Sequence, residues 1–249
     1  MYLRFLSLLV FSSSALCAEM RVCAEPDNLP LSHADGSGFE NRIARLLAAE
    51  LGREPVFIWH PQRLGFVRKT FGANLCDVWM GVPADFERAL TTKPYYRSTY
   101  VFVYGKRPLR SFDDAALKEM RIGVQLPGND MAATPPGHAL AAKGANVIGF
   151  PVYGEQPAGQ RIAEAIARGE LDAGVVWGPA AGLFAHMNNL GMTRASPPKE
   201  LDGLPFEFSI AIGVRRGERA LRDELNAALE RRKADVDAVL DQYAVPRAP

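Results

Sequence analysis

Residues 20–59 read MRVCAEPDNLPLSHADGSGFENRIARLLAAELGREPVFIW, and this stretch decides the fold. Short apolar runs at its two ends, 20–24 and 56–59, are typical of strands. Between them, Ser37 and Glu40 have the spacing of a capping box, which predicts the start of a helix. The apolar side chains that follow fall on one helical face, with a glycine after them: Phe39, Ile43, Leu46, Leu47, Leu51 and then Gly52. A strand, a helix and a second strand in succession indicate parallel strands with a helix packed on them.

The alternation of strand and helix patterns continues along the rest of the chain. Further runs typical of strands cover residues 76–82, 99–104, 121–124, 147–150, 171–177 and 206–214. Helical patterns lie near 64–71 and 162–166, after Pro179, and from Arg219 to about Tyr243. Breaks rich in proline and glycine at 105–108 and 196–205 separate two blocks of this alternation.

We therefore predict an α/β protein of two lobes, each with a mostly parallel sheet and helices on both faces. The last strand and helices have no sheet of their own, so we expect them to return to the first lobe. This gives two crossover strands and a hinge between the lobes. The predicted boundaries are 19–104 plus 206–249 for lobe 1 and 109–201 for lobe 2, with a signal peptide at 1–18.

The N-terminus has the layout of a secretory signal. Arg4 is the only charge in the first eighteen residues, and an apolar run and small residues follow it. The run is well short of the roughly 20 apolar residues that span a membrane, and no later segment approaches that length. We expect export to the periplasm, with cleavage after Ala18 or after Cys17, and no membrane insertion.

Export changes the charge and the cysteine count. Removing Arg4 takes Lys+Arg from 29 to 28, equal to the 28 Asp+Glu, so we expect no nucleic-acid partner. The leader also removes Cys17 and leaves Cys23 and Cys76. An even count in an oxidising compartment predicts a disulfide between them, and two buried free thiols are the alternative.

Ligands of such sheets bind outside the carboxyl ends of the strands. We expect a ligand- or partner-binding cleft there, between the lobes, with a floor of prolines and glycines. The candidate cleft residues, with Tyr95 and Tyr96 at the entrance of a strand, are Glu25, Asp27, Asn28, Arg88, Tyr95, Tyr96, Asn129, Asp130, Tyr153 and Trp177. Each aromatic among them could instead belong to a lobe core, and Glu25 with Asp27 could form a solvated turn instead of a carboxylate pair.

The sequence gives little sign of catalysis. His33, His60, His138 and His186 are scattered without metal-ligand spacing. The chain contains neither a nucleophile elbow nor a phosphate-binding glycine loop. We therefore expect no enzyme activity, no cofactor and no metal.

Several stretches resemble a known family. RVCAEPDNLPLS (21–32) and GFENRIA (38–44) are similar to the opening strand, loop and first helix of type II (family 3) periplasmic solute-binding proteins. Three further stretches resemble a narrower group, the quinoprotein dehydrogenase-associated, MoxJ/XoxJ-like proteins: WHPQRLGFVR (59–68), CDVWMGVP (76–83) and TTKPYYRSTYVFV (91–103). The resemblance implies a periplasmic accessory that assists the maturation or activation of a PQQ-dependent methanol or alcohol dehydrogenase, which would be its partner. The alternative is the receptor of an ABC importer, with a small polar or aromatic molecule as its ligand.

The chain also departs from ordinary amino-acid binders of that fold. Those proteins hold the ligand carboxylate with an arginine, and Arg88 resembles it, although the stretch from Arg88 to Pro94 is shorter than theirs. They hold the ligand ammonium with an aspartate after the strand that corresponds to residues 171–177. Here Trp177 and Gly178 stand in that place.

Overall fold

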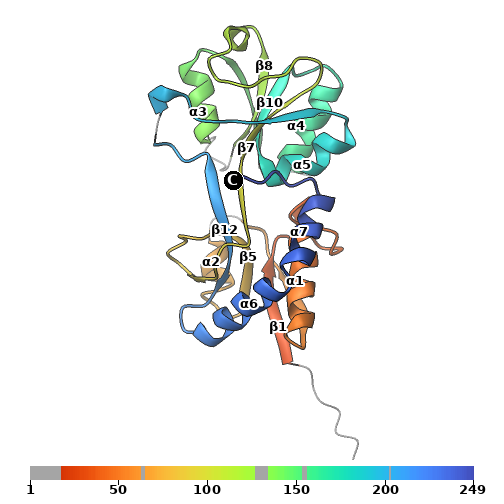
Figure 1. Ribbon diagram of the computed structural model, residues 1–249, viewed down its shortest axis with the longest axis vertical. Coiled ribbons are helices and arrows are strands. Elements are labelled where there is room, and N and C mark those ends of the chain that lie inside the picture. The colour runs from red at the N-terminus through yellow and green to blue at the C-terminus, as the bar shows by residue number, and fades with distance from the viewer. Residues whose placement is uncertain (1–17, 63–64, 127–133, 153–155, 202) are drawn as a thin grey trace, which may run out of the picture.

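The computed structural model describes residues 18–62, 65–126, 134–152, 156–201 and 203–249. Within these ranges the chain forms two α/β lobes, one above the other, connected by long strands (Figure 1). The predicted signal peptide lies almost wholly outside the described residues. Among the helices of the described part, none is long and apolar enough to cross a membrane.

Lobe 1 is built on a sheet with the strand order β4-β1-β5-β12. Its strands are β1 (Ala18–Ala24), β4 (Arg53–Trp59), β5 (Val78–Pro83), β6 (Leu90–Thr91) and β12 (Glu207–Val214), with the small pair β2 (Asp27–Asn28) and β3 (Ser32–His33) beside it. Its helices are α1 (Phe39–Glu50), α2 (Phe66–Lys69), α6 (Arg219–Arg231) and α7 (Lys233–Gln242). β1 runs parallel to β4 and β5, as the strand–helix–strand pattern predicts.

Lobe 2 continues the order as β7-β10-β8-β9, with β11 on the other side of β7. Its strands are β8 (Arg121–Leu126), β9 (Asn146–Pro151), β10 (Ala173–Trp177) and β11 (Gly191–Arg194). Its helices are α3 (Pro135–Ala142), α4 (Ala158–Ala167), α5 (Gly178–Met187) and the short 3-10 turns η1 (Ala115–Lys118) and η2 (Lys199–Leu201).

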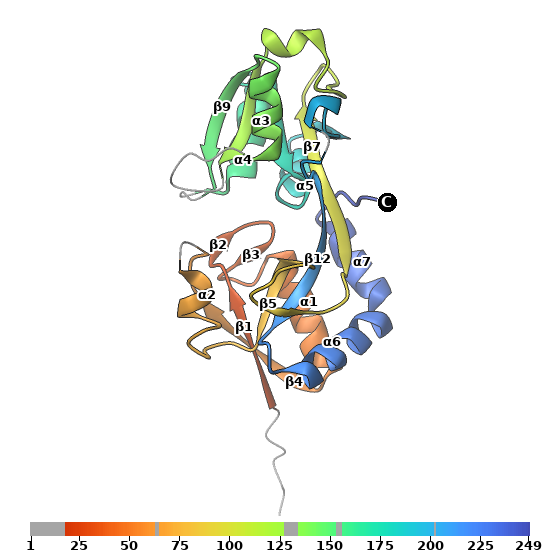
Figure 2. The ribbon, with the colours of Figure 1, turned by 90° about the vertical axis from the view of Figure 1, so that its left-hand side faces the viewer.

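Two strands connect the lobes, β7 (Tyr96–Tyr104) and β12. The first part of β7 pairs with β12, and its second part, from Tyr100, pairs with β10 and β11 (Figure 2). The two-lobed α/β fold with two crossover strands is confirmed. Because both crossover strands run antiparallel to their neighbours, the sheet is mixed, where a mostly parallel sheet was expected. The lobe boundaries stay a prediction, and β7 contributes to the pairing on both sides of the hinge.

Each lobe has its own apolar core. In lobe 1, alternate residues of β1 and β5 such as Val22, Val78 and Met80 point into a core shared with α1, α6 and α7. The opposite face of the same strands carries a smaller cluster around Cys23 and Cys76. The predicted disulfide joins these two cysteines, whose Cα atoms are 5.5 Å apart, within the usual range for such a bridge.

The C-terminal segment crosses the hinge on the outer side. Ser98 donates a hydrogen bond from its hydroxyl to the carbonyl of Pro246 at 2.5 Å, and the N–H of Ala248 donates to the carbonyl of Arg97 at 2.9 Å. On the lobe 2 side, Gly182 of α5 lies so close to the backbone of residue 244 that a side chain there would clash. The segment therefore packs against both lobes.

Candidate binding site at the facing strand ends

The carboxyl ends of the parallel strands in the two lobes face each other. Figure 2 shows β1 of lobe 1 and β9 of lobe 2 pointing toward one another across the middle of the molecule. β1 leads directly into Glu25, and β10 ends at Trp177. Open α/β sheets bind their ligands at such strand ends, so a ligand or partner of this chain is expected to contact the residues that lie there.

Glu25 connects two loops of lobe 1. Its side chain is 7% exposed, and its carboxylate accepts a hydrogen bond from the backbone N–H of Gln62, which lies past the end of β4. Its backbone carbonyl accepts a hydrogen bond from the hydroxyl of Ser32 at 2.8 Å. A buried carboxylate satisfied in this way holds the loops after β1 and β4 together.

Asp27 and Asn28 lie in the loop that follows, as the two residues of β2. Asp27 is exposed, and its carboxylate lies 3.6 Å from Nε2 of His33, while Asn28 is half-buried. The loop is fixed to α1 because the amide oxygen of Asn41 accepts the N–H of His33 at 2.9 Å. Leu31, at the turn of this loop, packs against the core of lobe 1 and against a core of lobe 2. The loop is therefore held in place before any ligand arrives.

Trp177 occupies the hinge. Its indole meets Tyr100 of β7 and Phe208 of β12 edge-on, with ring centroids 5.4 and 5.5 Å apart. Its backbone N–H donates to the side-chain oxygen of Gln125, the buried residue near the end of β8, at 2.8 Å. Burial raises the pKa of the Tyr100 hydroxyl to about 12. Rings from both crossover strands thus surround the last residue of β10.

Tyr95 and Tyr96 do not line this site. Tyr96 is 7% exposed and belongs to the core of lobe 1, and Tyr95 packs against that core with its ring 4.9 Å from that of Tyr96. Tyr95 lines a small pocket of about 130 Å³ beside α6 and α7, on the outer side of the lobe. Burial, with the neighbouring carboxyl of Glu40, raises the pKa of both hydroxyls well above their ordinary value. The returning C-terminal helices cover the start of β7, so a position beside Pro94 does not expose these rings.

Arg88 also lies elsewhere. It is exposed in the segment between β5 and β6, and the carbonyl of its neighbour Glu87 accepts a hydrogen bond from Arg216, just past the end of β12. Since Val214 of β12 pairs with Val78 at the start of β5, that contact lies beside the beginning of β5 and not at its carboxyl end. Arg88 lines a pocket together with Gln62, but among the described contacts it has no hydrogen bond or ion pair with Glu25 and no ring contact with Trp177.

Three predicted site residues, Asn129, Asp130 and Tyr153, lie outside the described residues. Tyr100 and Phe208, the partners of Trp177, were not among the residues predicted from the sequence. The pattern of side chains in the two crossover strands could have indicated them. Alternate side chains of each strand lie on one face of the sheet, and Tyr100 and Phe208 lie on the face that contacts Trp177. Across the described ranges, no group of three His, Cys, Asp or Glu side chains could hold a metal ion.

Comparison with known proteins gives relatives along nearly the whole chain. The sequence is 34% identical to protein MoxJ of Methylorubrum extorquens over 92% of this chain and 82% of that protein. It is 32% identical to protein MoxJ of Paracoccus denitrificans over 97% of this chain and 94% of that protein. The crystal structure of the periplasmic binding protein XoxJ from Methylobacterium extorquens AM1 superposes with a TM-score of 0.74 at 33% identity, covering 92% of this chain and 99% of that one. No family model matches the chain.

Proposed function

Because this chain belongs to the MoxJ family within the type II periplasmic binding-protein fold, we propose that it is an exported periplasmic accessory of a PQQ-dependent methanol or alcohol dehydrogenase. In this proposal it acts by binding and not by catalysis. It receives part of the dehydrogenase between its lobes and assists the maturation or activation of that enzyme. The resemblance of residues 59–68, 76–83 and 91–103 to the dehydrogenase-associated group supports the choice of partner.

The main support for the proposal is the set of aromatic side chains around Trp177. Where an amino-acid receptor would place an aspartate for the ligand ammonium, the chain places an indole set between Tyr100 and Phe208. Among the described residues that end β8, β9 and β10, none is acidic. A half-buried aromatic cluster at a hinge suits an apolar side chain of a partner, because aromatic residues dominate the energetics of protein interfaces.

We expect the purified chain to form a complex with the purified PQQ-dependent dehydrogenase of its own periplasm, measured by size exclusion with light scattering and by calorimetry. Trp177→Leu should weaken this binding about tenfold or more, since central aromatic residues contribute most to such contacts. Phe57→Leu is the control, because it changes a half-buried ring on the edge strand β4. Failure of the wild-type chain to bind the apo or the PQQ-loaded enzyme would contradict the proposal.

Free α-amino acids should not bind. A closed site must pair both charges of an amino acid, and an indole attracts a cation by only about 0.5–2 kcal/mol. That is less than the roughly 3–5 kcal/mol lost when one partner of a buried ion pair is removed. Calorimetry against the twenty amino acids should therefore give no heat of binding at micromolar concentrations. Micromolar binding of any one of them, lost in Trp177→Leu, would favour an importer receptor.

A further inference from the structure

Described residues from two of the sequence stretches that resemble the dehydrogenase-associated group, 59–68 and 76–83, meet at one pocket of lobe 1. The pocket has a volume of about 310 Å³, and its lining includes Gln62, Phe66, Arg68, Trp79, Phe86 and Arg88. It borders the strand ends described above through Gln62, whose backbone N–H donates to the carboxylate of Glu25, while its other lining residues take no part in the contacts described for that site.

The pocket lies on the thinly covered face of the lobe 1 sheet. Since side chains of a strand alternate between faces, Val78 points toward α1 while Trp79 points to the other side. In the described ranges, the four-residue helix α2 and loops cover that side, whereas α1, α6 and α7 cover the opposite one. Figure 2 shows α2 on the side of lobe 1 away from α6 and α7.

An aromatic cluster forms the floor of the pocket. The indole of Trp79 contacts Phe66, Phe71 and Phe86, with ring centroids 4.8, 6.1 and 5.4 Å away. Phe66 and Phe71 are buried in the same cluster as the Cys23–Cys76 bridge, while Trp79 and Phe86 stay half-buried. The rings are therefore held in a fixed arrangement and still offer apolar surface.

The two arginines of the pocket, Arg68 and Arg88, have no acidic partner among the described residues. Arg68 and Arg88 are both exposed, and within the described part of the chain neither guanidinium has a hydrogen bond, ion pair or ring contact. By contrast, Arg21 and Arg215 of the same lobe both pair with Asp77, at 2.6 and 2.9 Å. No carboxylate is among the described lining residues. An arginine stays charged at any working pH, so the pocket is positive in a chain that is otherwise nearly neutral.

We propose that this pocket docks an acidic, aromatic-bearing segment of a protein partner. A carboxylate of that segment accepts hydrogen bonds from the guanidinium groups of Arg68 and Arg88, whose planar geometry matches a carboxylate. An aromatic side chain next to it packs on Trp79 and Phe86. Small-molecule sites bury most of their ligand, and the exposure of both arginines instead suits a chain that lies across the surface.

The proposal rests on the proposed function only in taking the partner to be a protein, so the test has two independent arms. The first arm is calorimetry with the full chain and blocked peptides of alternating aspartate and phenylalanine, lysine and phenylalanine, or aspartate and alanine. We expect measurable binding of the first peptide only, weakened by salt and at least tenfold weaker in Arg68→Ala/Arg88→Ala. Phenylacetate binding as tightly as that peptide would make the pocket a solute site and overturn the proposal.

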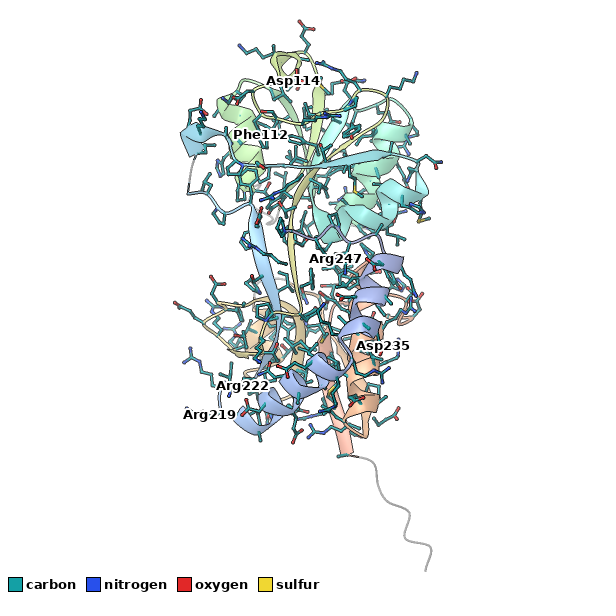
Figure 3. The ribbon with its side chains drawn as sticks, viewed as in Figure 1. Phe112, Asp114, Arg219, Arg222, Asp235 and Arg247 are labelled. Carbon is teal, nitrogen blue, oxygen red and sulfur yellow. A yellow bond between two sulfur atoms is a disulfide. The ribbon has the colours of Figure 1, made fainter. Side chains whose placement is uncertain are left out.

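The second arm measures the affinity of the same variant for the dehydrogenase. The matched control is Arg110→Ala/Arg219→Ala, which removes the same charge from two exposed arginines elsewhere; Figure 3 shows Arg219 at the end of lobe 1 remote from lobe 2. Arg68→Lys/Arg88→Lys keeps both charges but lacks the planar guanidinium groups, so it should bind the dehydrogenase more weakly than wild type does. If the wild-type chain binds the dehydrogenase and Arg68→Ala/Arg88→Ala binds it equally well, the docking role of the pocket is refuted. The proposed function is unaffected by that result. If the wild-type chain binds the acidic aromatic peptide but no dehydrogenase, the pocket stands and the choice of partner fails.

Discussion

Replacing Cys23 and Cys76 together by alanine is expected to lower the free energy of unfolding by about 4 kcal/mol. The bridge closes a loop with a sequence separation of 53 residues, and cross-linking so long a loop removes much of the conformational freedom of the unfolded chain. Both cysteines are buried, at 1% and 0% exposure, so alanine avoids placing a hydroxyl in the small cluster beneath Trp79. Urea unfolding followed by circular dichroism measures the change.

The control for this variant is the wild-type protein with its disulfide reduced. Reduction alone should produce most of the loss, because it frees the unfolded chain while leaving both sulfur atoms in place. Any additional loss in the alanine variant reports the packing of the sulfurs against Phe66 and Phe71. Titration of two free thiols in the denatured, unreduced protein, or a loss below about 1 kcal/mol, would contradict the expected role of the bridge.

The fold could be predicted from the sequence where the local apolar pattern agrees with the order of strands and helices along the chain. The apolar periodicity of residues 39–51 and the glycine after them give α1 within a residue of its bounds. The disulfide could be predicted because Cys23 and Cys76, the two cysteines left once Cys17 is removed with the predicted leader, allow only one pairing. The crossover of β12 followed because its long alternating strand comes after lobe 2 is complete and has no sheet of its own there.

The site residues were harder to predict, because their surroundings come from segments distant in sequence. Whether Tyr95 and Tyr96 are exposed depends on α6 and α7, which return more than a hundred residues later and cover them. The place of Arg88 depends on Arg216, whose guanidinium donates a hydrogen bond to the carbonyl of the neighbouring Glu87. A local motif fixes neither contact. Glu25 and Trp177, which directly follow or end a strand, were easier because the strand itself carries them to the sheet edge.

The predicted capping box is wrong for a similar reason. α1 begins after Gly38, without a side-chain cap, and the side chain of Asp35 instead accepts the N–H of Ser37 at 2.7 Å. Hydrogen bonds from the side chain and the backbone of Ser37 lower the pKa of the Asp35 carboxyl to about 2. Glu40 turns inward, because Gly81 of β5 lacks a side chain and leaves room for its carboxyl. The pattern places Glu40 at an exposed helix end. In the structure Glu40 is only 6% exposed and lies beside Tyr95 and Tyr96.

Replacing Glu40 by glutamine should therefore stabilise the protein at high pH. Burial raises the pKa of the Glu40 carboxyl from 4.5 to about 7, so between these values the folded state holds a proton that the unfolded state releases. The stability that wild type draws from this group is fully present below pH 4.5, falls as the pH rises, and is lost above about pH 7. The shift corresponds to roughly 3 kcal/mol. Glutamine stays neutral, so we expect Glu40→Gln to exceed wild type by roughly 3 kcal/mol at pH 8 and to match it near pH 4.5.

The measurement is the difference in unfolding free energy between Glu40→Gln and wild type, taken by urea titration at several values between pH 4.5 and pH 8.5. Taking the difference removes the other carboxylates from the comparison. Several of them, such as Asp77 beside Arg21, have a lowered pKa and destabilise both proteins alike in acid. Glu119→Gln, at an exposed position, is the matched control and should differ from wild type by less than about 0.5 kcal/mol throughout. A difference for Glu40→Gln that stays constant with pH, or that grows as the pH falls, would show that Glu40 is ionised in the folded protein and that its burial is compensated by a partner.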